Sequence, residues 1–254
     1  MLMNVRELKN YKLDAKDGDI GSVEDFYFDD EGWTIRYLVA NTGPWLVGRR
    51  VLISPISLGK LEPNKKIVEV ALTKSQIEKS PDIDTHKPIS RQHETAYYDY
   101  YGYPYYWYGP HLWGPIPYPG YIAPPSAQTG TVDSEIEAAK DRQRNEDQHL
   151  RSTQEVTNYY IEATDGEIGH VEDFIIEDQT WTIRYIVVDT KNWWPGKKVV
   201  ISPQWIREVN WGDSKIYADV SRDAIRNAPE YRKGLDRGYE TRLHEHHGRQ
   251  VYWD

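Results

Sequence analysis

Three histidines and a glutamate, at residues 244–247, form the first candidate for a chemical site in this sequence. Imidazole is the commonest metal ligand among side chains, and such a cluster could take zinc or nickel. The sequence is repeated, as shown below, and in the first repeat the aligned residues are Tyr98, Tyr100 and Tyr101. Because tyrosine is a poor replacement for a histidine ligand, we expect aromatic packing here. We predict no metal and no other cofactor.

Adjacent carboxylates occur twice, at residues 24–25 and 172–173. Two carboxyl groups can perform acid–base catalysis when they share a pocket and their pKa values differ. Neighbouring residues of a strand, however, point to opposite faces. We therefore expect structural ion pairs, with Arg36 and Arg184 on the next strand as partners.

Ser54 and Ser202 each precede a proline in the repeated sequence. A serine nucleophile needs a base within reach, and no histidine recurs at a matching place in both repeats. The sequence contains neither a dinucleotide fingerprint nor a phosphate-binding loop motif. We therefore predict that the protein is not an enzyme.

Aromatic residues outside the predicted strands are the better functional candidates, because loops carry recognition more often than strands do. Three tryptophans fall in the loop that joins two strands, and four further aromatics lie in the segment that ends each repeat. Together they form the candidate interaction surface: Trp45, Trp193, Trp194, Tyr100, Tyr101, Trp107 and Trp253.

The whole chain is built from two copies of one sequence pattern. Residues 17–26 (DGDIGSVEDF) return as residues 165–174 (DGEIGHVEDF), 148 positions later. At the same offset WTIRY recurs at residues 33–37 and 181–185, and VLISP at 51–55 is matched by VVISP at 199–203. A period of this length indicates two small domains of one fold.

Each copy reads as a turn of helix, five or six short strands and a closing helix. The Asp-Gly pairs at residues 17–18 and 165–166 indicate hairpins, and a bulge at residues 24–25 would give the following strand one inward face. Residues 33–40 are apolar on both faces, which predicts a buried strand. Thr73 and Ser221 are expected to cap helices. Short strands with frequent turns favour a small, closed or partly closed barrel.

The repeat continues beyond the predicted barrel. Residues 97–121 contain ten of the chain's 20 tyrosines and alone would resemble a low-complexity linker. Glu94 and the pair at residues 106–107, however, align with Glu240 and residues 252–253 at an offset of 146. We therefore expect each copy to carry an aromatic extension that packs on a barrel.

These motifs resemble the PRC-barrel, a domain found in the photosynthetic reaction-centre H subunit and at the C-terminus of the ribosome maturation factor RimM. The resemblance covers roughly residues 4–81 and 152–229 and is closest to bacterial proteins with two such domains. It implies a β-barrel used for binding and assembly, without shared catalytic residues.

Composition narrows the possible partners. The formal net charge is −9, whereas nucleic-acid-binding surfaces are basic, so we predict no direct nucleic-acid contact. The absence of cysteine excludes disulfides and thiolate metal sites. No apolar run reaches the length of a membrane span or of a signal peptide, and a cytoplasmic location is expected.

The sequence thus predicts a mainly β protein. It has a first repeat at residues 1–107, a Pro-rich and then charged linker at 108–151, and a second repeat at 152–254. The predicted function is protein interaction or assembly, regulatory or stress-related by resemblance, through a protein partner or self-association as a homodimer. Two alternatives stay open: a small-ligand or metal-binding module at a cleft between the barrels, and a ribosome-associated assembly factor.

Overall fold

The computed structural model describes residues 1–81, 89–120, 149–190 and 197–253. The fold is mainly β, with two seven-stranded sheets, which confirms the predicted class of two small β-barrel domains with short helices. The chain divides into two compact units. The N-terminal unit comprises Leu8–Ser152 and Gln179–Trp181, and the C-terminal unit comprises Met1–Glu7, Thr153–Asp178 and Thr182–Asp254.

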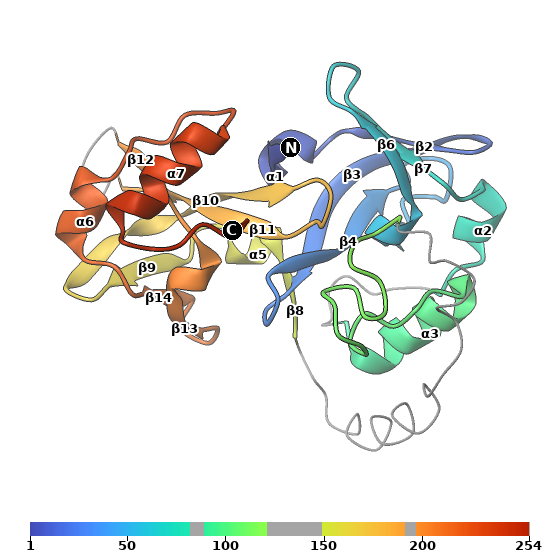
Figure 1. The fold of residues 1–254 in the computed structure, drawn as a ribbon. Helices are drawn as coiled ribbons and strands as arrows, with labels where there is room; N and C mark the ends of the chain where they lie inside the picture. Colours follow the sequence, from blue (N-terminus) through green and yellow to red (C-terminus); the bar gives the residue numbers. More distant parts are fainter. Residues whose placement is uncertain (82–88, 121–148, 191–196, 254) are drawn as a thin grey trace. The chain divides into compact units, whose positions relative to one another are not determined.

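In the N-terminal unit the sheet has the strand order β5-β4-β3-β2-β7-β6, with β8 also paired to β3 (Figure 1). Strands β2 and β7 are parallel, and the other pairs are antiparallel. The elements are β2 (Lys12–Ala15), β3 (Gly18–Asp29), β4 (Thr34–Asn41), β5 (Arg50–Ile53), the 3₁₀ helix η1 (Pro55–Ser57), β6 (Leu58–Glu62), β7 (Ile67–Val70), α2 (Lys74–Glu78), α3 (Arg91–Tyr101) and β8 (Leu150–Ser152).

The C-terminal unit repeats this topology in the order β12-β11-β10-β9-β14-β13, with β1 paired to β10. The helix α1 (Val5–Leu8) joins β1 to the N-terminal unit. The elements are β1 (Leu2–Asn4), α5 (Thr153–Val156), β9 (Tyr160–Ala163), β10 (Gly166–Glu177), β11 (Ile183–Asp189), β12 (Lys198–Ile201), the 3₁₀ helix η3 (Pro203–Trp205), β13 (Ile206–Asn210), β14 (Lys215–Ala218), α6 (Arg222–Asn227) and α7 (Arg237–His246).

Each unit includes the strand that opens the other repeat. In the C-terminal unit, β1 pairs with β10 in the register Met3↔Ile176, and the Asn4 side-chain amide donates to Asp173 Oδ2 at 2.8 Å. In the N-terminal unit, β8 pairs with β3 in the register Arg151↔Phe28. The repeats are therefore contiguous in sequence, whereas the units are assembled from exchanged segments.

This assembly differs from the predicted domain boundaries. The predicted linker at residues 108–151 ends in β8, which is part of a sheet. At its other end Trp113 is completely buried, and its indole nitrogen donates to the carbonyl of Thr180 at 2.9 Å. A large apolar ring with a hydrogen-bonded N–H is a typical core residue, so the start of this segment is folded. Its middle, residues 121–148, lies outside the described residues.

The bulge predicted at residues 24–25 is confirmed in both units. The pairing of β3 with β4 shifts between Val23 and Asp25, and β10 with β11 shifts at the equivalent place. The shift lets Val23 and Phe26 both face the core, with at most 1% of either side chain exposed. Just before it, Gly21 has φ of +114°, and a Cβ there would lie 2.0 Å from the carbonyl oxygen of Asn41. Only glycine fits such a close approach.

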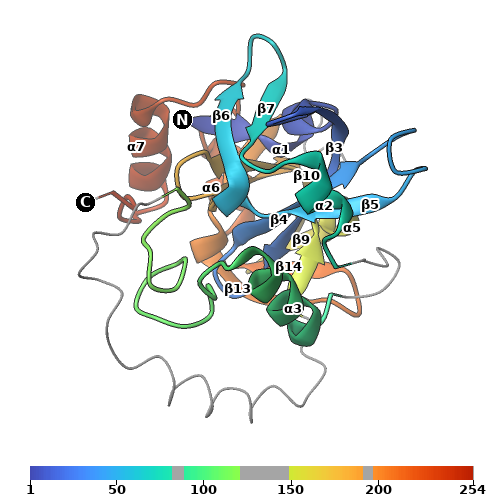
Figure 2. The same cartoon turned by 90° about the vertical axis from the view of Figure 1, so that its right-hand side faces the viewer.

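The other predicted elements also match. Strand β4 is buried on both faces from Thr34 to Ala40, as expected from its apolar residues. Thr73 and Ser221 are the N-caps of α2 and α6. Figure 2 shows the N-terminal unit from another side, with the β6–β7 hairpin extending from it and α2 and α3 on one flank.

Candidate functional site

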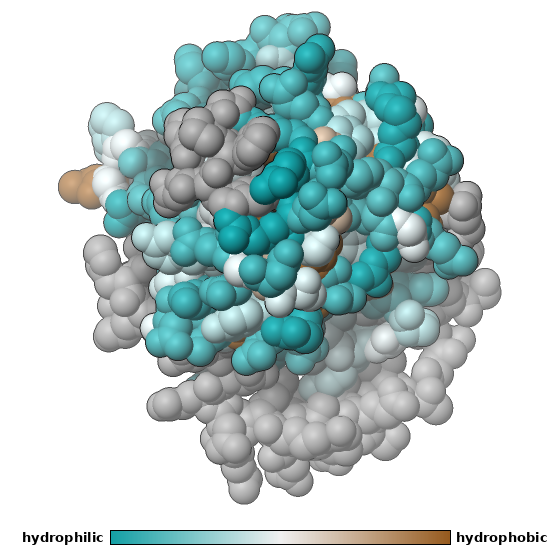
Figure 3. Space-filling view, turned by 90° about the vertical axis from the view of Figure 1, so that its left-hand side faces the viewer, coloured by the Kyte–Doolittle hydropathy of each residue, from teal (hydrophilic) through white to brown (hydrophobic). Residues whose placement is uncertain are grey.

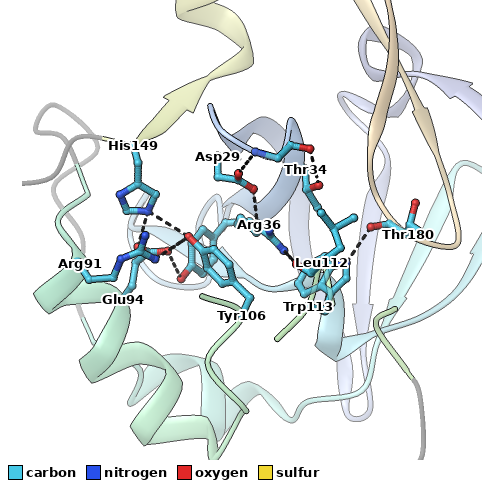
Figure 4. A network of polar contacts seen from close by, with 12 residues as sticks. Asp29, Thr34, Arg36, Arg91, Glu94, Tyr106, Leu112, Trp113, His149 and Thr180 are labelled. Carbon is cyan, nitrogen blue, oxygen red and sulfur yellow. Dashed lines mark hydrogen bonds and ion pairs between the residues drawn. The ribbon is translucent and has the colours of Figure 1, made fainter. Parts of the chain in front are cut away.

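The most distinctive feature of the N-terminal unit is a buried glutamate beneath its aromatic extension. Glu94 lies on α3 and is fully buried. Its Oε1 accepts hydrogen bonds from the hydroxyls of Tyr37 at 3.1 Å and Tyr106 at 2.8 Å. Its Oε2 lies 3.0 Å from Arg91 Nη1 and 2.8 Å from His149 Nε2. Burying a carboxylate is costly unless it is paired and hydrogen-bonded, and these four groups meet that requirement (Figure 4).

A second buried ion pair lies beside this cluster. Arg36 Nε is 2.7 Å from Asp29 Oδ2, and Arg36 Nη1 donates to the Leu112 carbonyl at 2.8 Å. The guanidinium carbon is 3.9 Å from the centre of the Tyr106 ring. Tyr106 therefore contacts Arg36 through its ring and Glu94 through its hydroxyl (Figure 4).

Burial also fixes the protonation of the tyrosines around Glu94. Removal from water raises the pKa of Tyr37 well above its usual value, and the nearby Glu94 carboxylate adds to this effect. The pKa of Tyr106 is raised by the same causes. Both hydroxyls thus remain proton donors to Glu94 throughout the ordinary pH range.

The C-terminal unit repeats the same arrangement around Glu240, which is 2% exposed. Its Oε1 accepts from Tyr185 at 3.1 Å and Tyr252 at 2.9 Å, and its Oε2 lies 3.2 Å from Arg237 Nη1. The arginines differ in environment, since the side chain of Arg237 is 57% exposed and that of Arg91 is 14% exposed.

A cavity of about 370 Å³ adjoins the cluster in the N-terminal unit. Arg36, Arg91, Tyr106 and Leu112 line it, together with His149. Its lining is therefore both charged and aromatic. A cavity with a few polar groups among apolar walls is the usual form of a small-molecule site.

Within the N-terminal unit, the described residues of the predicted interaction surface lie in different environments. Trp45 is half-buried in the loop between β4 and β5, with the Lys74 ammonium 5.4 Å from its ring centre. Tyr100 is 41% exposed and donates to the Gln76 carbonyl at 2.8 Å. Tyr101 stacks on Tyr103 at 5.3 Å.

Two further residues of the predicted surface pack against arginine side chains. Trp107 is half-buried beneath the Arg91 guanidinium at 4.3 Å, beside the Glu94 cluster. Trp253 occupies the same place in the other unit, 4.0 Å from Arg237. Trp193 and Trp194 lie outside the described residues.

The adjacent carboxylates and the two serines considered in the sequence take structural positions. The expected pairing of Arg36 with residues 24–25 is wrong, because Asp25 lies opposite Val39 in the sheet register and Arg36 reaches Asp29 instead. Glu24 instead pairs with Arg50. The serine oxygens at positions 54 and 202 accept from the backbone as N-caps of η1 and η3.

The histidine cluster lies at the end of α7. His244 is 1% exposed, and its Nε2 is 3.1 Å from the Tyr185 hydroxyl. Its ring also packs on Trp205 at 5.3 Å. Within the described residues, no group of three or more His, Cys, Asp or Glu side chains is arranged to hold a metal ion.

His247 provides a pH-dependent test of this packing. Burial lowers its pKa to about 4 from an ordinary 6.5. The stability that neutral His247 contributes is therefore present above pH 6.5 and is lost as the pH falls toward 4. The variant His247→Tyr carries the residue found at the aligned position of the first repeat. We expect it to flatten the acid dependence of the urea midpoint in this window, whereas equal slopes for both proteins would contradict the assignment.

Comparison with known families agrees with the duplicated fold. The PRC-barrel domain model matches residues 3–77 and again residues 160–225, together more than half of the chain. The chain belongs to the PRC-barrel family. An uncharacterized protein of Deinococcus radiodurans is 32% identical over 78 residues. That match spans 30% of this chain and 27% of the Deinococcus protein.

The family match covers β2–β7 and β9–β14 but not β8, the aromatic extensions or Glu94. Glu94 and its partners Arg91, Tyr106 and His149 thus lie outside the matched segments, whereas its partner Tyr37 lies within the first. Within the described residues, no helix of this PRC-barrel protein is both long and apolar enough to cross a bilayer.

Sequence reasoning missed the role of Glu94. In the stretch RQHETAYYDYY its nearest neighbours along the chain are the polar residues His93 and Thr95, so nothing local indicates that it is buried. The available signal was the repeat itself, because Arg91, Glu94 and Tyr106 all recur 146 positions later. A charged residue kept with its hydrogen-bonding partners in both copies indicates a buried network.

Proposed function

We propose that this PRC-barrel protein is a non-enzymatic protein-binding module that engages its partner through the loop at residues 42–49. The observation that carries the proposal is the tip of this loop. Val47 is 95% exposed and adopts φ of +51°. A β-branched residue in the left-handed region is a true outlier, and backbone strain of this kind concentrates at functional sites.

The loop is held in place by hydrogen bonds at its base. The Gly48 amide donates to the Gly43 carbonyl at 2.7 Å, and Thr42 Oγ1 donates to the Arg49 carbonyl at 2.5 Å. The Arg49 guanidinium reaches the carbonyls of Glu78 and Ser80 at 2.7 and 2.8 Å. An apolar tip fixed in this way is pre-organised for contact, which lowers the entropic cost of binding.

Large apolar side chains are seldom exposed among the described residues. On the face of the molecule that Figure 3 shows, most of the coloured residues are hydrophilic. Among the described residues, the exposed large hydrophobic side chains are Met1, Val47, Tyr100 and Tyr160, and Val47 is the most exposed of them. Trp45 and Leu46 adjoin it and are half-buried. An exposed apolar tip beside half-buried aromatic and aliphatic side chains has the composition of an interface core.

Val47→Asp tests the proposal. Because the side chain lies in solvent, the change should alter the free energy of unfolding by no more than about 0.5 kcal/mol. We expect it to reduce recovery of the partner at least about tenfold when the full chain is used to capture proteins from cells, since a buried charge without a counterion opposes binding. Tyr160→Asp, at an exposed apolar site of the C-terminal unit, is the matched control. Equal recovery by wild type and Val47→Asp would refute the proposal.

A further inference from the structure

The cavity beside Glu94 contains no residue of the loop at 42–49, and it is lined by arginines and aromatic side chains. We propose that it binds a small organic carboxylate through the guanidinium groups of Arg36 and Arg91. The inference goes beyond the protein-binding function proposed above and does not depend on it.

The first argument is the balance of donors and acceptors. Both oxygens of Asp29 are engaged, by the Gly32 amide and by Arg36 Nε. Both oxygens of Glu94 are engaged by its four neighbours. Each carboxylate at this site is therefore paired with a cationic or hydrogen-bonding group, and Glu94 Oε2 has its two ion-pair contacts but no hydrogen bond.

The guanidinium groups of Arg36 and Arg91, by contrast, do not use all of their N–H donors. Arg36 uses Nε and Nη1, and Arg91 uses Nη1 for both Tyr106 and Glu94. Within the described part of the chain, Nη2 of each arginine donates to no protein group. Both residues line the cavity. A cavity with spare guanidinium donors is suited to an anion.

The second argument is the net charge around the cavity, which selects among anions. The two arginines face the carboxylates of Asp29 and Glu94, and Glu31 adds an exposed carboxylate at the rim. Because these three carboxylates outnumber the two guanidinium groups, they repel a doubly charged anion such as phosphate about twice as strongly as a singly charged one. A monocarboxylate brings one charge and offers two oxygens to planar guanidinium groups.

The third argument is the rest of the wall. The Tyr106 ring, Trp107 and Leu112 supply apolar surface, so the body of the ligand can be hydrocarbon. The volume of about 370 Å³ admits a small molecule. Benzoate, a planar monocarboxylate with an apolar body, is therefore the chosen probe.

Titration calorimetry on the full chain tests the inference with three ligands: benzoate, its neutral amide benzamide, and inorganic phosphate. We expect saturable binding of benzoate at one site per chain and no detectable binding of benzamide or phosphate. Phosphate binding in place of benzoate would overturn the assignment to a carboxylate. Absence of benzoate binding, or equal binding of benzamide, would overturn it altogether.

Variants locate the site. Arg91→Gln should weaken benzoate binding about tenfold or more, the usual effect of losing a charged hydrogen bond. Arg237→Gln, the same change at the exposed equivalent in the C-terminal unit, should leave the affinity unchanged. Leu112→Trp keeps every charge and fills the cavity, so it should abolish binding even if Arg91→Gln proves unstable. Equal effects of the two arginine variants, or full affinity in Leu112→Trp, would contradict the proposed site.

Discussion

Replacing Glu94 by alanine is expected to destabilise the N-terminal unit by about 3–5 kcal/mol. The change leaves Arg91 and His149 without their buried counterion and removes the acceptor of the Tyr37 and Tyr106 hydroxyls. Removing one partner of a buried ionic network is costly because the remaining charge stays desolvated. Hydrogen exchange resolved to β3 and β4 would report the loss in this unit.

Glu240→Ala provides the matched comparison within the same molecule. Glu240 is hydrogen-bonded by the two equivalent tyrosines, Tyr185 and Tyr252. Its arginine partner, however, is 57% exposed and keeps its hydration. We therefore expect a smaller loss, about 1–3 kcal/mol, reported by β10 and β11. Equal losses of unfolding free energy in the two variants would contradict the view that exposure of the paired arginine sets the cost of removing the glutamate.

Removal of residues 2–7, at the N-terminus, is expected to destabilise the C-terminal unit. These residues form β1 and most of α1, and β1 pairs with β10 of the second repeat rather than with a strand of its own repeat. The deletion exposes the space filled by Val5, which is 2% exposed, at a cost of about 1.5–3 kcal/mol. It also removes the Asn4 bond to Asp173, at about 1–3 kcal/mol.

The strands that respond to the deletion show whether β1 pairs with the other repeat or with its own. Amide hydrogen exchange should become faster in β10 and β11, some 170 positions away from the deletion, and should remain slow in β2 and β7. Asn4→Ala should give the same pattern at smaller amplitude, with exposed Lys12→Ala as the neutral control. Faster exchange confined to β2 and β3 would show that β1 pairs within its own repeat.

The sequence allowed most of the fold to be predicted, because the deciding patterns are local. The bulge at Asp25 follows from the spacing of Val23 and Phe26, and the caps at Thr73 and Ser221 follow from single side chains. The strand exchange could not be predicted. Both repeats open with a similar segment that fits either sheet, so its partner depends on tertiary packing and chain connection rather than on any local signal.

The candidate site was less predictable for a related reason. Ion-pair partners depend on the register of the sheet, and the bulge that brings Phe26 inward also places Asp25 opposite Val39, away from Arg36. Burial of Glu94 arises where α3, β4 and the residue preceding β8 converge, and no single segment encodes it. Trp45 in the loop at residues 42–49 is a candidate from the sequence. Val47 becomes a candidate only through its positive φ angle and its exposure, which the sequence does not reveal.

The central claim, that the loop at residues 42–49 binds a protein, is tested most directly by site-specific photo-crosslinking. A photoreactive amino acid replaces Val47 in one full-length variant and Tyr160 in another, both exposed positions. After irradiation in cells, the account predicts one discrete covalent adduct with another protein from position 47 and none from position 160. No adduct at position 47, or the same adducts from both positions, would contradict it.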